Sequence, residues 1–139
     1  MKLSVIIPVF NERQSVEQVI RNVTDCGIPD VEIDDIYMGN GVSELVLMGL
    51  QALLNDGDEV LVPALTYIAS ANAVTYTGAT PVFVDSEPKR WQMDIGAAEE
   101  KITDRTRAIM PVHLYGHACD MDAVHAAMDG HYRRAVAAE

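Results

Sequence analysis

The chain has 139 residues, enough for one domain with a substantial core and short for a two-domain enzyme. Twenty-one acidic residues against ten basic ones give a formal net charge of -11, and no apolar run is long enough to span a bilayer. Such a negative field repels nucleic acid and anionic lipid surfaces. We therefore expect a single α/β domain over residues 1–139 that binds neither nucleic acid nor membrane.

Two features favour a cytoplasmic protein. Cys26 and Cys119 lie far apart and outside any CxxC pattern, which is typical of free thiols in a reducing compartment. The first apolar run is short and contains Pro8, so it indicates a strand rather than a signal peptide. We expect the cytoplasm, or the cytoplasm of the expression host if the chain is engineered.

Short apolar runs alternate with longer amphipathic segments, the pattern of parallel strands joined by crossover helices. In the first half of the chain, strands are expected over 3–10, 35–38 and 59–62, with helices over 12–24 and 43–54. In the second half, strands are expected over 80–84 and 107–112, with helices over 68–76, 95–102 and 120–138. Gly130 could interrupt the last helix. The pattern predicts a three-layer α/β/α sandwich with a mostly parallel, five-stranded, Rossmann-like sheet.

The segment Gly39-Asn40-Gly41-Val42-Ser43-Glu44 lies between an expected strand and an expected helix. Backbone N–H groups at the start of a helix, together with the helix dipole, favour a bound phosphate. The alternative is a tight turn in which Ser43 simply caps the helix. Both interpretations stay open on spacing alone.

Tyr67 follows the third expected strand at its carboxyl end, the edge where open α/β sheets bind ligands. An aromatic side chain there can stack on a flat ring, or it can pack at the sheet edge.

His113, His117, Cys119 and Asp120 are residue types that bind metals, but Tyr115-Gly116 between the histidines indicates a loop rather than a helical ligand pair. We expect no metal site. No Ser-His-Asp or Cys-His pair has a supporting motif, so no catalytic residue is assigned.

The strings PALTYIASANAVTYTGATPVFVDSEPKRWQMD and TRAIMPVHLYGHACDMDAV, within residues 63–124, resemble the DegT/DnrJ/EryC1 sugar-nucleotide aminotransferases. The resemblance implies pyridoxal phosphate (PLP) as cofactor, with Tyr67 stacked on its pyridine ring. It also implies that the third strand lies between the fourth and fifth. The family's Schiff-base lysine and pyridine-nitrogen acid lie on strands beyond the one ending at Val112, and no lysine follows Lys101 here.

Two other stretches resemble other families. DDIYMGNGVSELVLMGLQALLNDGDEVLVPA, over about 34–63, resembles class I alanine-aminotransferase-like enzymes, and the resemblance implies that Gly41, Val42 and Ser43 grip the cofactor phosphate. KLSVIIPVFNERQSVEQVIRNV, over about 1–32, resembles family 2 glycosyltransferases. There the residues matching Pro8, Asn11 and Glu12 lie beside a sugar nucleotide, but the family's Asp-x-Asp is absent.

Three family-like stretches in so short a chain suggest an engineered or computationally generated chimera with no evolved activity and no cofactor. Whether the chain is an enzyme stays open, and the missing lysine and acid weigh against it. The alternative is a truncated large-domain fragment of a PLP-dependent sugar aminotransferase. It would bind PLP or phosphate non-covalently at the Gly41–Ser43 turn beside Tyr67. A second alternative is a nucleotide-sugar binding module near Pro8 and Glu12.

The strand order expected from these resemblances is 4-3-5-1-2. If nothing fills the place of the missing parent strands, an exposed sheet edge would favour a homodimer.

Overall fold

The computed structural model describes residues 2–8, 18, 21 and 32–137. The chain divides into two compact units, 1–49 and 50–139. The expected single domain over 1–139 stays a prediction. No helix in the described ranges is both long and apolar enough to cross a membrane.

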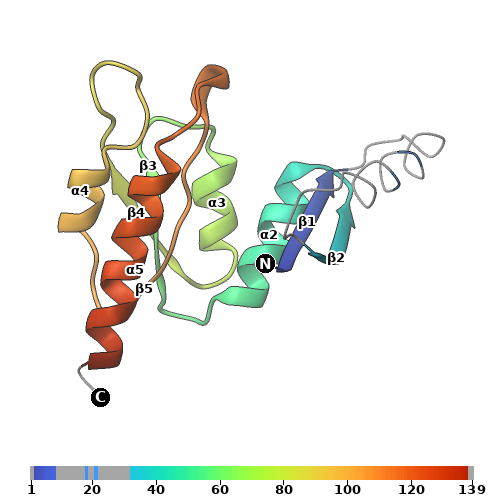
Figure 1. The fold of residues 1–139 in the computed structure, drawn as a ribbon, viewed down its shortest axis with the longest axis horizontal. Helices are drawn as coiled ribbons and strands as arrows, with labels where there is room; N and C mark the ends of the chain where they lie inside the picture. The colour runs from blue at the N-terminus through green and yellow to red at the C-terminus, as the bar shows by residue number, and fades with distance from the viewer. Residues whose placement is uncertain (1, 9–17, 19–20, 22–31, 138–139) are drawn as a thin grey trace. The chain divides into compact units, whose positions relative to one another are not determined.

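The first unit contains a parallel pair of strands. β1 (Lys2–Pro8) pairs with β2 (Glu32–Gly39), with a register irregularity between Leu3 and Ser4 (Figure 1). The turn at the end of β2 leads into α2 (Val42–Leu53), which extends past the boundary between the units. The helix expected over 12–24 lies outside the described residues, apart from Gln18 and Arg21.

The second unit alternates strands and helices, as the sequence pattern predicts. Its elements are β3 (Glu59–Pro63), α3 (Ala69–Thr75), β4 (Thr80–Val84), α4 (Ile95–Glu100), β5 (Thr106–Ile109), the 3-10 turn η1 (Leu114–Gly116) and α5 (Met121–Ala137). The helix α5 continues through Gly130 without a break.

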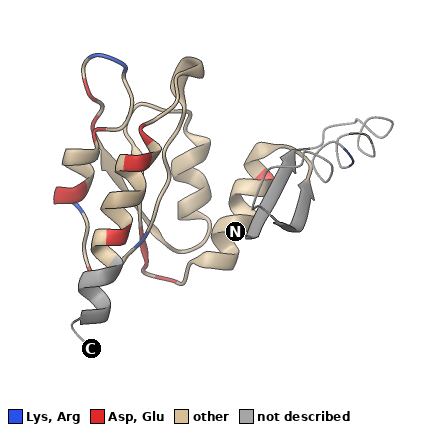
Figure 2. Cartoon of the chain, in the orientation of Figure 1, with Lys and Arg blue, Asp and Glu red and all other residues tan. Residues whose placement is uncertain are grey.

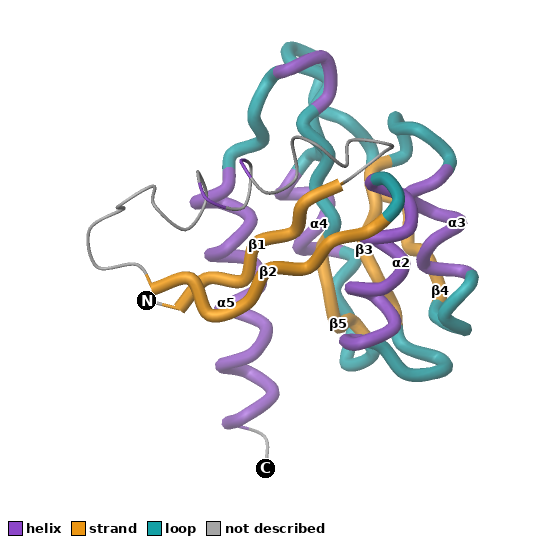
Figure 3. Tube along the Cα trace, turned by 90° about the vertical axis from the view of Figure 1, so that its right-hand side faces the viewer, coloured by secondary structure: helices purple, strands orange, loops and turns teal. Residues whose placement is uncertain are grey.

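These strands form a parallel sheet in the order β4-β3-β5, with β3 in the centre (Figure 3). Every residue of β3 is buried, as a central parallel strand requires, and the residues that follow Glu59 in this strand are apolar. The expected place of the third strand, between the fourth and the fifth, is confirmed.

Helices cover both faces of this three-stranded sheet. α3 packs against β3 and β4 on one side, whereas α4 and α5 pack together on the other, where α5 contacts β5 (Figure 1). On the α4 side, Leu61, Val84, Met93 and Ala98 form a buried cluster. Because side chains alternate along a strand, the buried Val60 and Val62 face the α3 side. The second unit is therefore a three-layer α/β/α arrangement.

The expected five-stranded sheet is not what the structure describes. The strands form one two-stranded and one three-stranded sheet, and the β5 to β1 pairing of the order 4-3-5-1-2 is not among the described pairs. The alternating pattern of the sequence identifies each strand, but it does not determine which strands pair with each other through backbone hydrogen bonds. β5 is also only four residues long, with an irregular register against β3 beside Glu59.

Candidate functional site

The carboxyl edge of the three-stranded sheet has the topology of a ligand site. The chain leaves β3 into α3 on one face, and it leaves β5 towards α5 on the other. Open α/β sheets bind ligands outside the carboxyl ends of their strands where such a switch occurs. The loops that follow β3, β4 and β5 are therefore the candidate site of the second unit.

Tyr67 lies in the loop that follows β3 at this edge. Its side chain is 76% exposed, and its carbonyl oxygen accepts a hydrogen bond of 3.1 Å from the Ser70 N–H in the first turn of α3. The loop is also tied to β4, because the Ala64 N–H donates to the Val84 carbonyl at 2.7 Å. Tyr67 is thus exposed on a loop held by hydrogen bonds, and its stacking on a flat ring stays a prediction.

The Gly41–Ser43 turn belongs to the first unit. Gly41 has a φ of +106°, a conformation that L side chains rarely adopt, and nothing lies within 4 Å of the position its Cβ would occupy. The first helical hydrogen bond of α2 runs from the Leu45 N–H to the Gly41 carbonyl at 3.3 Å. Val42 and Ser43 come before Leu45 in the chain, so their N–H groups have no carbonyl partner within the helix and can donate to a ligand at its start.

Glu44 adds a negative charge to the same turn. Its carboxylate accepts a hydrogen bond from the Asn40 N–H, an arrangement related to the capping box at helix starts. The turn therefore has donors for an anion, and a carboxylate that opposes it. The structure describes the turn and Tyr67 in separate units.

Gln92 is a residue of the carboxyl edge that the sequence did not single out. It is buried in the loop after β4, and its amide reaches Leu114 in the loop after β5. Nε2 donates to the carbonyls of Arg90 and Leu114, both at 3.3 Å, while Oε1 accepts from the Leu114 N–H at 3.4 Å. The amide nitrogen and the amide oxygen of Gln92 therefore both have hydrogen-bond partners, and this one side chain joins the loop after β4 to the loop after β5.

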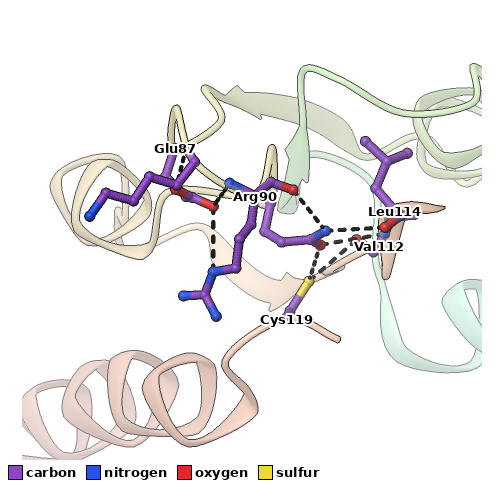
Figure 4. A network of polar contacts seen from close by, with 7 residues as sticks. Glu87, Arg90, Val112, Leu114 and Cys119 are labelled. Carbon is purple, nitrogen blue, oxygen red and sulfur yellow. Dashed lines mark hydrogen bonds and ion pairs between the residues drawn. The ribbon is translucent and has the colours of Figure 1, made fainter. Parts of the chain in front are cut away.

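Cys119 completes this network. Its Sγ donates to Gln92 Oε1 at 3.0 Å and lies 3.3 Å from the Val112 carbonyl (Figure 4). Burial raises the pKa of the Cys119 thiol, so it stays protonated at neutral pH. The His113 Nδ1 accepts from the Cys119 N–H at 3.1 Å. In the part of the chain that the structure describes, no three His, Cys, Asp or Glu side chains gather as a metal site.

The loop after β4 ends in a tight, charged tip. The Glu87 carboxylate accepts the N–H groups of Lys89 and Arg90 at 2.8 and 2.6 Å, and lies 3.7 Å from the Arg90 guanidinium. The bond from the Lys89 N–H, together with those from Arg90, holds the pKa of the Glu87 carboxyl below its usual value. Figure 2 shows basic residues at the tip of this loop.

The parallel sheet β4-β3-β5, with helices on both of its faces, defines an α/β fold. The sequence profile of the DegT/DnrJ/EryC1/StrS aminotransferase family matches residues 36–132, which is more than half of the chain. The chain belongs to this family.

Curated relatives agree with this assignment. The GDP-perosamine synthase of Escherichia coli O157:H7 is 56% identical over 87 residues, covering 63% of this chain and 24% of that protein. The GDP-perosamine synthase of Caulobacter vibrioides is 52% identical over 99 residues, covering 71% and 26%. The chain thus spans about a quarter of the length of these relatives.

Solved structures share the fold. S. venezuelae DesV, solved in complex with a ketimine intermediate, is 47% identical with a TM-score of 0.62, covering 64% of this chain and 24% of that one. The aminotransferase from Psychrobacter cryohalolentis is 40% identical with a TM-score of 0.63, covering 65% and 23%. The chain is a portion of the aminotransferase fold.

These findings overturn the engineered chimera. One family profile covers residues 36–132, across the expected join at 63. An alanine aminotransferase of Mycobacterium tuberculosis is also 46% identical over 88 residues, covering 63% of this chain and 20% of that protein, so a resemblance to such enzymes is no evidence of a join. The two resemblances coincide because a glycine turn that leads from a strand into a helix makes the same conformational demands in related cofactor folds.

The glycosyltransferase resemblance of residues 1–32 is also not supported. A dTDP-3-amino-3,6-dideoxy-alpha-D-galactopyranose transaminase from Aneurinibacillus thermoaerophilus is 38% identical over a match that covers 86% of this chain. Residues 36–139 alone cannot supply that coverage, so the match extends into the amino-terminal segment. Of the residues expected beside a sugar nucleotide, Asn11 and Glu12 lie outside the described residues.

Proposed function

We propose that this chain supplies part of the cofactor site of a PLP-dependent nucleotide-sugar aminotransferase. Gly41, Val42 and Ser43 would hold the phosphate of the cofactor, and Tyr67 would stack on its pyridine ring. The observation that carries the proposal is the exposed Tyr67 ring at the carboxyl end of β3, inside a family match that also spans the Gly41–Ser43 turn.

The turn suits a phosphate group in three ways. Gly41 adopts a left-handed φ and leaves open space where a side chain would stand. The Val42 and Ser43 N–H groups precede the first helical bond, and the dipole of the twelve-residue helix α2 favours an anion at this end. Ser43 is exposed, so its hydroxyl is available as a further donor.

Tyr67 suits an aromatic ring because the loop that bears it is fixed at both sides. The Ala64 N–H is hydrogen-bonded to β4 and the Ser70 N–H to the Tyr67 carbonyl, so the loop backbone is already ordered when a ring stacks on the tyrosine. PLP, when bound, supplies an electron sink for amino-group exchange. The part assigned to this chain is to bind the phosphate and to orient the ring.

Covalent attachment of the cofactor is assigned to the remainder of a longer protein. The chain spans about a quarter of the length of these curated relatives. The lysine that binds the cofactor can therefore lie in a part of the whole protein that this chain does not include. Transfer of an amino group to a nucleotide sugar is accordingly proposed for the whole protein, on the strength of the relatives' names.

Calorimetric titration of the full chain with pyridoxamine phosphate tests the proposal. This form of the cofactor has no aldehyde, so it cannot attach to surface lysines. We expect saturable binding that weakens about tenfold in Tyr67→Ala and is retained in Tyr67→Phe, because one stacked ring is lost or kept. Tyr76→Ala removes another exposed tyrosine of the same unit and serves as the matched control. Absence of binding, or equal loss in both alanine variants, would overturn the proposal.

A further inference from the structure

Two aromatic residues of the carboxyl edge have a strained backbone. Among the described residues, Trp91 and Tyr115 are the non-glycine positions with positive φ, at 62° and 52°. A left-handed conformation is unfavourable for a bulky side chain, and such strain persists where the surrounding structure imposes it, often at ligand sites.

Burial of the rings does not offset this strain. Trp91 is 58% exposed and Tyr115 is 86% exposed, so the fold gains little from packing them. Both backbones are held by neighbouring groups instead. The Trp91 N–H donates to the Glu87 carbonyl at 3.1 Å, and the His117 N–H closes the turn around Tyr115 by donating to the Leu114 carbonyl at 3.1 Å.

One side chain connects the two strained positions. Trp91 directly precedes Gln92, and Tyr115 directly follows Leu114, and these two neighbours are joined by the paired hydrogen bonds of the Gln92 amide. The loops after β4 and β5 therefore present their aromatic residues at the same edge of the sheet. That edge also carries Tyr67.

Positive charge adjoins the aromatic residues. Lys89 and Arg90 directly precede Trp91 in a chain whose formal net charge is -11. Glu87 is paired with Arg90, and among the described residues no ion pair is made by the exposed Lys89 ammonium. An aromatic face beside cations is the combination that binds a base together with its phosphates.

We propose that Trp91 and Tyr115 form a stacking surface for the base of a nucleoside diphosphate, and that Lys89 and Arg90 contact the diphosphate. The inference rests on the proposed function, since it names the part of the chain that would recognise the nucleotide of a nucleotide sugar. The names of the relatives include GDP, UDP and dTDP sugars, which carry different bases. A stacking surface suits such a range of nucleotides, because an aromatic face can stack on any base.

The chain has one tryptophan, so its fluorescence reports on Trp91 alone. Titration of the full chain with GDP should quench this fluorescence saturably, after correction with free tryptophan amide. Tyr115→Ala and Lys89→Ala should each weaken GDP binding about tenfold, whereas Tyr115→Phe should retain it. Tyr76→Ala is the control, since Tyr76 is an exposed tyrosine with an ordinary φ of -68°.

Tyr115→Gly separates a binding role from a structural one. Glycine adopts positive φ without strain, so this variant should melt at a higher temperature and still bind GDP more weakly. A variant that gains stability and binds GDP as well as the unmodified chain would overturn the inference. So would an absence of quenching in the unmodified chain. If pyridoxamine phosphate binds while GDP does not, the proposed function stands and only this inference fails.

Discussion

Lys101 closes the outer edge of β4 by donating from Nζ to the Phe83 carbonyl at 2.7 Å. The Val84 carbonyl faces β3, because it accepts from the Ala64 N–H, and carbonyls of successive residues in a strand alternate in direction. The Phe83 carbonyl therefore faces outward, and the lysine occupies an acceptor that another strand would use. A charged side chain at an edge is a known defence against edge-to-edge pairing.

Removal of this lysine should promote self-association. We expect Lys101→Met to raise the association constant of the chain about tenfold, because an outward acceptor of β4 becomes available for pairing. Sedimentation equilibrium measures the constant. Lys89→Met makes the same charge change on a different loop, and equal association of both variants would show that charge alone is responsible. The homodimer through an exposed sheet edge stays a prediction, and this comparison tests whether β4 provides that edge.

The Gln92 amide should contribute measurably to stability. Gln92→Ala leaves the partly buried backbone groups of Leu114 without their partner and the Cys119 thiol without one of its acceptors. Loss of such bonds costs about 2 kcal/mol of unfolding free energy, which urea titration can measure. Gln51→Ala, at an exposed position of α2, should change stability by less than about 0.5 kcal/mol. Equal effects of the two substitutions would refute the role assigned to Gln92.

Glu59 should make the fold sensitive to acid. The hydroxyl of Thr103, followed by the Arg105 guanidinium, holds the pKa of the buried Glu59 carboxyl below its usual value, although burial acts in the opposite direction. A carboxyl with a lowered folded pKa stabilises the protein above its unfolded pKa, and that contribution is lost as the pH falls through the folded pKa.

Thr103→Val should therefore lower the unfolding free energy at neutral pH by about 1 kcal/mol and move acid unfolding to a higher pH. Circular dichroism during an acid titration measures the shift. Thr75→Val, on the exposed side of α3, makes the same chemical change away from this carboxyl. An acid midpoint that does not differ between the two variants would contradict the assignment.

Glu44 should weaken anion binding at the Gly41–Ser43 turn. Glu44→Gln removes the negative charge and keeps an oxygen that can accept from the Asn40 N–H, so inorganic phosphate should bind about threefold more tightly. Glu100→Gln removes an exposed charge from α4 and is the control. A loss of phosphate affinity in Glu44→Gln would mean that the cap matters more than the charge.

The sequence predicted the central strands well because their signal is local. A continuous apolar run places β3, and the residues that follow it place Tyr67 at the carboxyl end. The glycine turn before α2 was found for the same reason. Each of these features depends on a few adjacent residues.

Other features depend on partners far along the chain. Gln92 meets Leu114 at a separation of 22 residues, and Glu59 meets Arg105 at a separation of 46. Tyr115 adopts its positive φ directly after Leu114, and the residue type tyrosine does not indicate such a conformation. The chimera hypothesis is wrong because a short stretch contains too few residues to separate related families, whereas the family profile weighs residues 36–132 together.

Amide NMR of the isotope-labelled full chain, titrated with pyridoxamine phosphate, can locate the bound cofactor residue by residue. We expect saturable shifts of the Gly41, Val42 and Ser43 N–H signals and of the Tyr67 ring signals, with the amino end of β3 unchanged. If the signals of the turn and of Tyr67 stay unchanged at saturating ligand, the proposed cofactor site is wrong.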